Sequence, residues 1–143
     1  AKKKSAQHFL LRFLLNNRIF MNKKKILIVE DEDVIRRYCK RLLSKEDREL
    51  LLAENVEKAF AAIDANNLDL LLTDLRLPDG HGIDVIRRFK NKFPNKKVII
   101  MTGSPTPDER WEDVGFPNVM QLIYKPFEAA VLETAVNKGL GEV

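Results

Sequence analysis

The feature that most constrains the fold is a strand–helix alternation that repeats five times after residue 21. Apolar runs such as ILIV at residues 26–29, LLL at 70–72 and VII at 98–100 are separated by segments in which apolar residues have helical spacing. Repeated strand–helix units indicate parallel strands joined by right-handed crossovers. Continuous apolar strands are typical of a sheet covered on both faces. We therefore predict an α/β fold with a five-stranded parallel sheet and helices on both faces.

The expected elements follow from this spacing and from the breaks between the runs. We place strands at residues 25–30, 50–53, 69–74, 98–102 and 121–124, and helices at residues 33–43, 56–65, 82–93, 107–114 and 128–138. We predict the flavodoxin-like strand order 2-1-3-4-5. In the first of these helices, Val34, Ile35, Tyr38 and Leu42 are expected to face the sheet. Gly139 is expected to end the last helix.

Charge divides the chain into a basic arm and an acidic remainder. The chain has 143 residues and a formal net charge of +4. Residues 1–25 hold 8 of the 25 basic residues and none of the 21 acidic ones, which leaves 17 basic against 21 acidic residues, a net charge of −4, in residues 26–143. The overall charge is therefore a poor guide to nucleic acid binding. No segment after the last helix could form a DNA-binding domain, so we expect no direct DNA binding.

We interpret residues 1–22 as a basic N-terminal leader or a helical arm, and residues 23–143 as one domain. A lysine run followed by HFLLRFLL resembles the start of a signal peptide, but Arg12 interrupts the apolar stretch and no small-residue cleavage site follows. The segment is too short and too charged to insert into a membrane. Phe9, Leu10, Phe13 and Leu14 have the spacing of an amphipathic helix.

Charged residues follow three of the predicted strands at the point where each strand ends. They are Glu30 and Asp31 after the first strand, Asp74 at the end of the third and Lys125 after the fifth. In a parallel sheet these ends meet in one crevice, where ligands bind. Three carboxylates this close repel one another unless a cation lies among them, so we predict a hard divalent metal with oxygen ligands. The lysine indicates an anion beside the metal, and the whole set favours phosphoryl chemistry on an aspartate.

The same residues give the chain a resemblance to the receiver domain of bacterial two-component response regulators (CheY-like), across nearly all of residues 23–140. All five functional positions of the family occur in the right order, each at the end of a strand. The five are an acidic pair, the phosphorylated aspartate, a hydroxyl residue and a lysine: Glu30, Asp31, Asp74, Thr102 and Lys125. Pro78 and Gly82 lie four and eight residues after Asp74, where the family keeps its loop proline and glycine.

The resemblance implies a magnesium site that contains the phosphoacceptor. Asp74 would be the ionised nucleophile, because a carboxylate that attacks phosphorus gives an acyl phosphate. Asp31 and Asp74 would bind Mg²⁺ directly, and Glu30 would act through a bound water. The backbone carbonyl of Arg76 is the third protein ligand that the resemblance implies.

The resemblance also implies how the phosphoryl group is held. Lys125 would pair with the phosphoryl oxygens, and Thr102 would donate a hydrogen bond from its hydroxyl group. The peptide bond between Lys125 and Pro126 is expected to be cis. Arg76 and Ser104, two residues beyond Asp74 and Thr102, would tune dephosphorylation.

We therefore expect a cytoplasmic response regulator receiver that accepts a phosphoryl group from a histidine kinase or a phosphotransfer protein. It would be a signalling domain, not an enzyme beyond its own phosphorylation and dephosphorylation. Its output would reach a downstream target protein, and the face made by the fourth helix, fifth strand and fifth helix could carry a dimer. The family's aromatic switch position is Leu122 here, so we expect the signal to pass through Thr102 and the loop at residues 103–107.

Two alternatives remain open. The chain could be a receiver fragment of a larger regulator or of a hybrid kinase. Less favoured is a haloacid-dehalogenase-type phosphatase with Asp31 as nucleophile, to whose DxD motif Asp31-Glu32-Asp33 is similar. That family needs a threonine or valine where Ile35 stands, and the chain lacks the length for a cap. A purely structural pseudo-receiver should have lost some of the five positions, and none is lost.

Overall fold

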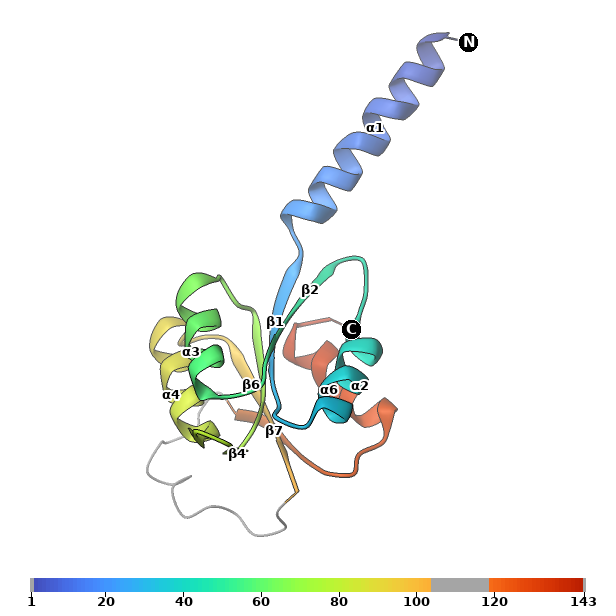
Figure 1. Ribbon diagram of the computed structural model, residues 1–143. Coiled ribbons are helices and arrows are strands. Elements are labelled where there is room, and N and C mark those ends of the chain that lie inside the picture. The colour runs from blue at the N-terminus through green and yellow to red at the C-terminus, as the bar shows by residue number, and fades with distance from the viewer. Residues whose placement is uncertain (1, 104–118, 143) are drawn as a thin grey trace.

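The computed structural model describes residues 2–103 and 119–142, which form a five-stranded sheet, a two-stranded hairpin, flanking helices and a projecting N-terminal helix (Figure 1). The helices are α1 (Lys2–Met21), α2 (Asp33–Leu43), α3 (Val56–Ala65), α4 (Gly82–Lys92) and α6 (Ala129–Gly139). The strands are β1 (Lys24–Val29), β2 (Arg48–Ala53), β3 (Leu70–Asp74), β4 (Arg76–Leu77), β5 (Gly80–His81), β6 (Lys97–Thr102) and β7 (Val119–Tyr124). The helix expected at residues 107–114 lies outside the described residues.

The main sheet has five parallel strands in the order β2-β1-β3-β6-β7. This is the predicted order 2-1-3-4-5 for the five long strands in chain sequence, so the predicted fold class is confirmed. Helices α3 and α4 cover one face of the sheet, and α2 and α6 cover the other (Figure 1). The two layers explain why the strands are apolar on both sides.

Alternate residues of β1 enter two separate cores. Leu27 and Val29 pack with α3 and α4, whereas Ile26 and Ile28 pack with α2 and α6. All four side chains are fully buried, and every residue of β3 is buried as well. Because side chains alternate across a strand, a central strand with helices on both faces needs apolar residues at consecutive positions. These central strands deliver their last residues to a fixed edge of the sheet.

The predicted inward face of α2 is wrong in its rotation. The fully buried residues of this helix are Cys39 and Leu43, and Val34 is 80% exposed. Ile35 and Leu42 are only partly buried against the core. The apolar residues of α2 span a stripe wider than the surface that the sheet and α6 cover, so part of the stripe faces outward.

Helix α6 ends at Gly139, as expected. Gly139 is the last helical residue, and Gly141 is the glycine with the left-handed φ of 73°. The amide of Gly141 donates to the carbonyl of Lys138, and that of Leu140 donates to the carbonyl of Val136. Leu140 is partly buried against the core, which carries the chain one residue further before the turn.

Side-chain contacts hold the start of α3 and join β2 to the C-terminal segment. The carboxylate of Asp79 accepts hydrogen bonds from the amides of Val56 (2.8 Å) and Glu57 (3.1 Å) at the start of α3. The buried guanidinium of Arg48 donates to Asn137 Oδ1 (2.6 Å) and to Glu142 Oε2 (2.9 Å), so it joins β2 to the C-terminal segment.

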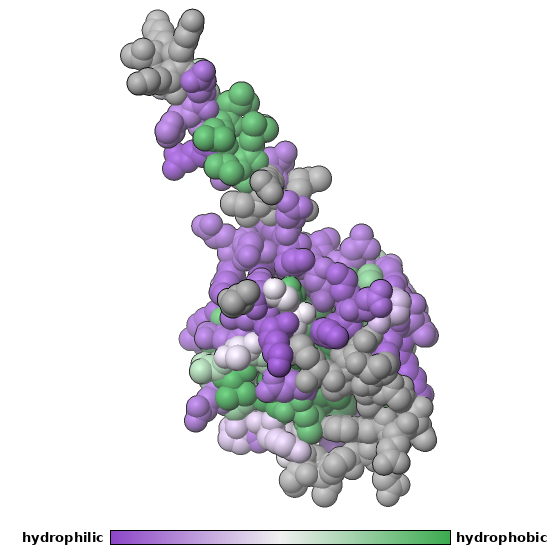
Figure 2. Space-filling model, turned by 180° about the vertical axis from the view of Figure 1, so that it is seen from behind, coloured by the Kyte–Doolittle hydropathy of each residue, from purple (hydrophilic) through white to green (hydrophobic). Residues whose placement is uncertain are grey.

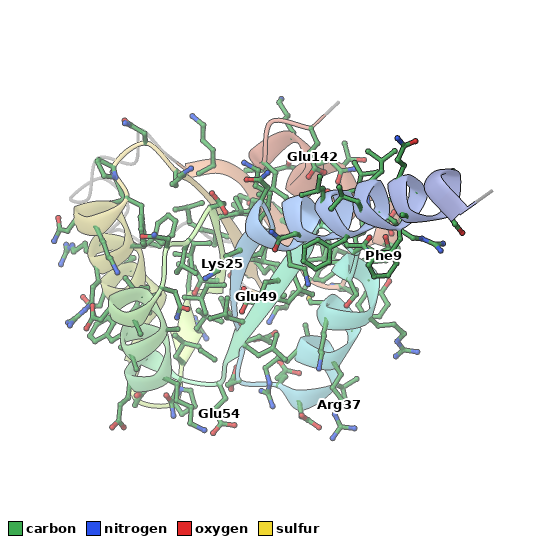
Figure 3. All side chains as sticks on the ribbon, turned by 90° about the horizontal axis from the view of Figure 1, so that it is seen from above. Phe9, Lys25, Arg37, Glu49, Glu54 and Glu142 are labelled. Carbon is green, nitrogen blue, oxygen red and sulfur yellow. The ribbon has the colours of Figure 1, made fainter. Side chains whose placement is uncertain are left out.

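Two further contacts lie at the strand borders. Lys25 and Glu49 form an ion pair of 3.8 Å between neighbouring positions of β1 and β2 (Figure 3). Strands β4 and β5 pair as a short antiparallel hairpin directly after Asp74. The sequence analysis did not predict this hairpin, because each of its strands has two residues and no apolar run.

Helix α1 projects away from the sheet as a single rod (Figure 1). Its large apolar side chains are between 49% and 74% exposed: Phe9, Leu10, Leu11, Phe13, Leu14 and Leu15. Figure 2 shows apolar surface on this projecting helix. Because these side chains occupy almost consecutive positions, they are not confined to one side, as the expected amphipathic helix would require. Among the described residues, no helix has the length and apolar character needed to cross a membrane.

Candidate functional site

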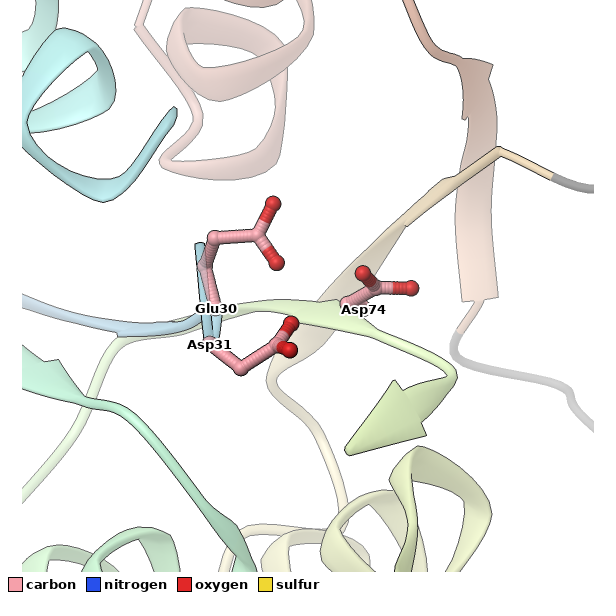
Figure 4. Close-up of side chains that lie close together, drawn as sticks. All are labelled: Glu30, Asp31 and Asp74. Carbon is pink, nitrogen blue, oxygen red and sulfur yellow. The ribbon is translucent and has the colours of Figure 1, made fainter. Parts of the chain in front are cut away.

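Three carboxylates gather at the carboxyl edge of the sheet (Figure 4). Glu30 and Asp31 directly follow β1, and Asp74 is the last residue of the neighbouring strand β3. One carboxylate oxygen from each lies within 4.8 Å of the others. The topology produces this cluster, since β1 and β3 are adjacent, parallel and end at the same level.

The carboxylate of Asp74 is held on both of its oxygens. Oδ1 accepts hydrogen bonds from the backbone amides of Leu75 (2.6 Å) and Arg76 (3.3 Å). Oδ2 accepts a hydrogen bond from the ammonium group of Lys125 at 2.7 Å. The hydroxyl of Thr73 donates to the backbone carbonyl of Asp74, and Asp74 is only 7% exposed. These contacts leave the carboxylate little freedom to rotate.

Lys125 reaches the cluster from the end of β7. Its peptide bond to Pro126 is cis, as expected. Its amide donates to the carbonyl of Thr102 (2.8 Å), and its ammonium forms ion pairs with both Glu30 and Asp74. Burial lowers the pKa of this ammonium, but the hydrogen bonds to Asp74 and Glu30 outweigh burial, so the net pKa lies above the ordinary lysine value. Lys125 is therefore charged inside the site.

Glu30 is fully buried, and this sets its electrostatics. Burial raises the pKa of its carboxyl group to about 7, although Lys125 opposes the shift. Its Oε1 accepts the hydrogen bond from Lys125, while its Oε2 has no hydrogen-bond partner among the residues that the structure describes. A buried carboxylate oxygen without a donor is costly, so this atom is suited to a cation or a water molecule.

The donor set fits a magnesium ion. Mg²⁺ takes oxygen ligands, keeps several waters and is bound by few carboxylates. The cluster offers three carboxylates and the unpartnered Oε2 of Glu30. Three carboxyl groups against the one ammonium of Lys125 also leave an acidic excess that a divalent cation would balance, and such a cation would favour the charged form of Glu30.

A cavity of about 480 Å³ opens beside the cluster. Its lining combines carboxylates, a cation, a hydroxyl group and an open glycine: Asp31, Glu32, Asp74, Arg76, Thr102, Gly103 and Lys125. A Cβ atom placed on Gly103 would meet no atom of the described residues within 4 Å. The predicted site residues thus lie together, except Ser104, which lies outside the described residues.

Gly82 brings α4 against the backbone of Asp74. Its amide donates to the carbonyl of Leu75 at 2.7 Å. A Cβ atom at Gly82 would lie 2.1 Å from the carbonyl oxygen of Asp74 and 2.9 Å from the Cα of Leu75. This close approach is the physical reason why the sequence has a glycine eight residues after Asp74.

Sequence reasoning missed Arg36. Its guanidinium donates to the backbone carbonyls of Glu30 (2.8 Å) and Asp31 (3.2 Å) from the first turns of α2. An arginine near the start of a helix carries no pattern that would have indicated this contact. By contrast, Leu122, at the family's aromatic position, is partly buried against the core, and Tyr124 is half exposed.

Comparisons with known proteins identify the family of the chain. The family model of the response regulator receiver domain matches residues 26–137. Sporulation initiation phosphotransferase F of Bacillus subtilis is 31% identical over 122 residues, which cover 84% of this chain and 96% of that protein. The crystal structure of the response regulator TrrA of Thermotoga maritima, in complex with Mg²⁺ and BeF, is similar with a TM-score of 0.68 and 30% identity, covering 80% of this chain and 97% of that one.

Other relatives are much longer than the matching region. The response regulator PilR of Pseudomonas aeruginosa is 35% identical over 83 residues, which are 58% of this chain and 19% of PilR. The first five curated relatives are covered over only 18–52% of their length. From the matched family, the fold and the carboxylate–lysine cluster at the strand ends, we conclude that this chain belongs to the response regulator receiver domains, which are phosphoacceptors in signal transduction.

Proposed function

We propose that Asp74 is the phosphoacceptor of this receiver. The observation that carries the proposal is the division of its carboxylate between two backbone amides on Oδ1 and the ammonium of Lys125 on Oδ2, at the wall of an open cavity. A fixed, ionised carboxylate beside a cation is prepared for nucleophilic attack. In the reaction, an oxygen of Asp74 forms a bond to phosphorus while the bond from phosphorus to the donor's leaving atom breaks.

The other residues of the cavity would hold the transferred group. The ammonium of Lys125 lies between Glu30 and Asp74, so it can pair with a phosphoryl oxygen once Asp74 is phosphorylated. Thr102 lines the cavity from the end of β6, where its hydroxyl can donate a hydrogen bond to the phosphoryl group. Gly103 leaves room for that group on the side of the described residues, since none of their atoms would meet a Cβ there.

We propose that Asp31, Asp74 and the backbone carbonyl of Arg76 bind Mg²⁺, with Glu30 acting through a water molecule. Bound there, the cation would neutralise charge on the carboxylates and on the phosphoryl oxygens. The unpartnered Oε2 of Glu30 and the three converging carboxylates support this assignment. The role of Glu30 is then to keep charge in the site without occupying the position of the incoming group.

The proposal extends to the partners of the domain. We propose that the donor is a histidine kinase or phosphotransfer protein, that residues 23–143 form the receiver and residues 1–22 an arm apart from it, and that the chain acts by signalling, not by turnover of a substrate. Receivers that occur within longer regulators, such as PilR, are compatible with this chain being part of a larger protein.

The test is phosphorylation by a small donor. The protein is incubated with acetyl phosphate and Mg²⁺ and its intact mass is measured, with Asp74→Asn and Asp31→Asn as paired variants. We expect one phosphoryl group on the parent protein, none on Asp74→Asn, and reduced but detectable modification on Asp31→Asn. If Asp74→Asn is modified like the parent and Asp31→Asn is not, Asp31 is the nucleophile and the phosphatase-like alternative replaces this proposal.

A further inference from the structure

Arg36 makes an unusual set of contacts for a residue on the outer side of the domain. It lies in the first turns of α2, yet its side chain is only 15% exposed. Its Nη1 donates to the carbonyls of Glu30 at 2.8 Å and Asp31 at 3.2 Å. Its Nη2 donates to Asp33 Oδ1 at 2.8 Å and lies 4.0 Å from Glu54 Oε2. One guanidinium therefore joins the segment after β1, the start of α2 and the end of β2.

We infer that Arg36 is a positioning residue for the metal-binding half of the site. The ladder of β1 ends at Val29, and the amide of Glu30 still donates to the carbonyl of Ala53 at 3.0 Å, whereas the carbonyls of Glu30 and Asp31 accept from Arg36. Two carbonyls held by one planar group fix the orientation of both peptide planes, and therefore the direction in which the two carboxylates leave the chain. This inference rests on the proposed function, because it assumes that these carboxylates bind Mg²⁺.

The N-terminus of α2 gives this segment little other support. Within the described part of the chain, the N-cap residue Glu32 makes no side-chain capping hydrogen bond. Asp31 itself is exposed at the mouth of the cavity. The carbonyl contacts from Arg36 are thus the side-chain contacts that hold the backbone of the acidic pair from the α2 side.

Arg36 acts through geometry more than through charge. Its guanidinium is paired with Asp33 and is close to Glu54, so the positive charge is largely balanced before it reaches the cluster. The negative charge of Glu30, Asp31 and Asp74 therefore stays available to a cation. A lysine at this position would keep the charge but could not serve two carbonyls and a carboxylate with one rigid fork.

Arg37 provides a matched control. It is the next residue on α2, and its Nη2 binds the other oxygen of the same Asp33 carboxylate at 2.6 Å. Its side chain is 75% exposed and points outward (Figure 3). In the described part of the chain it makes no hydrogen bond to the carbonyls of Glu30 or Asp31. Loss of Arg37 therefore removes the same charge and the same ion-pair partner, but not the positioning contact.

The experiment compares Mg²⁺ binding by the parent protein with Arg36→Met, Arg36→Lys and Arg37→Met, by isothermal titration calorimetry on protein shown to be folded by circular dichroism. We expect the Kd for Mg²⁺ to rise roughly tenfold in Arg36→Met, the loss typical when a second-sphere partner is removed. Arg36→Lys should fall between Arg36→Met and the parent, and Arg37→Met should stay within about twofold of the parent.

A second readout separates positioning from damage to the fold. The Mg²⁺ concentration for half-maximal phosphorylation by acetyl phosphate should rise with the Kd, while the rate at saturating Mg²⁺ stays within about twofold. Equal Kd values for Arg36→Met and Arg37→Met would overturn the inference, as would an Arg36→Lys protein that binds like the parent. If Arg36→Met does not fold, the comparison of Arg36→Lys with Arg37→Met decides. Failure of the parent itself to bind Mg²⁺ would instead overturn the proposed function.

Discussion

Replacement of Gly82 by alanine should damage both the fold and the phosphoacceptor. The new Cβ would lie 2.1 Å from the carbonyl oxygen of Asp74, 2.9 Å from the Cα of Leu75 and 3.0 Å from the carbonyl carbon of Asp74. All three are backbone atoms, so no side-chain rotation relieves the clash. Restoring ordinary van der Waals contact requires α4 and the end of β3 to separate by roughly 1 Å.

The free energy of this change can be estimated from its parts. Forcing extra volume into a packed region costs about 1–3 kcal/mol. Alanine gains up to about 1 kcal/mol over glycine in a helix interior, and less at the first residue of α4, where Gly82 lies. We therefore expect Gly82→Ala to lower the free energy of unfolding by about 1–3 kcal/mol. A displacement of about 1 Å at Asp74 should also slow phosphorylation by acetyl phosphate, by up to about 100-fold.

Two other glycines calibrate the measurement. Gly103→Ala should change the free energy of unfolding by less than about 0.5 kcal/mol, since a Cβ there meets no atom within 4 Å in residues 2–103 and 119–142. Gly141→Ala should cost about 1 kcal/mol, because its φ of 73° is left-handed, and should leave the phosphorylation rate unchanged. Urea unfolding followed by circular dichroism measures all three. If Gly82→Ala is as stable and as rapidly phosphorylated as Gly141→Ala, the close approach to Asp74 is not what requires glycine.

Three further predictions concern Asp79, Arg48 and Leu122. The amides of Val56 and Glu57 hold the pKa of Asp79 below its usual value, so the stability lost in Asp79→Asn should be largest at neutral pH and should disappear in urea titrations as the pH falls below about 4. Arg48→Met should lower the free energy of unfolding by about 1.5–3 kcal/mol, because the buried hydrogen bonds to Asn137 and Glu142 are lost. A variant as stable as the parent would show that these contacts do not stabilise the fold. Because Leu122 has no aromatic ring that could rotate on phosphorylation, a phosphoryl mimic should change amide exchange at Thr102 more than in β7. A larger change in β7 would show that this strand responds to phosphorylation without the aromatic residue.

The fold and the candidate site followed from the sequence because both depend on short-range signals. An apolar run marks each central strand, and a parallel sheet then brings the strand ends together without further information. Asp74 and Lys125 are 51 residues apart, yet each needs only its own strand to be recognised, and their 2.7 Å contact follows from topology. The acidic pair after β1 was predicted in the same way.

The features that could not be predicted depend on how the helices pack against the sheet. The helix α2 has apolar residues on a wide stripe, and periodicity does not say which part of that stripe meets the sheet. Val34 is therefore exposed while Cys39 is buried. The sequence indicated that α6 ends at Gly139, but it did not indicate that the left-handed residue is Gly141.

Arg36 and Gly82 show the same limit at the site. The fork of Arg36 reaches backbone carbonyls, which every residue has, so no side-chain pattern marks its targets. The glycine could be placed by its distance from Asp74 in the sequence, but the reason for it appears only in the approach of α4 to β3.

Direct location of the acyl phosphate tests whether Asp74 is the phosphoacceptor. After incubation with acetyl phosphate and Mg²⁺, borohydride reduces an aspartyl phosphate to homoserine, and mass spectrometry of the proteolytic peptides then identifies the converted residue. We expect homoserine at position 74 alone, and no homoserine there when Mg²⁺ is left out of the incubation. Conversion at Asp31, or an unconverted Asp74 in a protein that has gained a phosphoryl group, would contradict it.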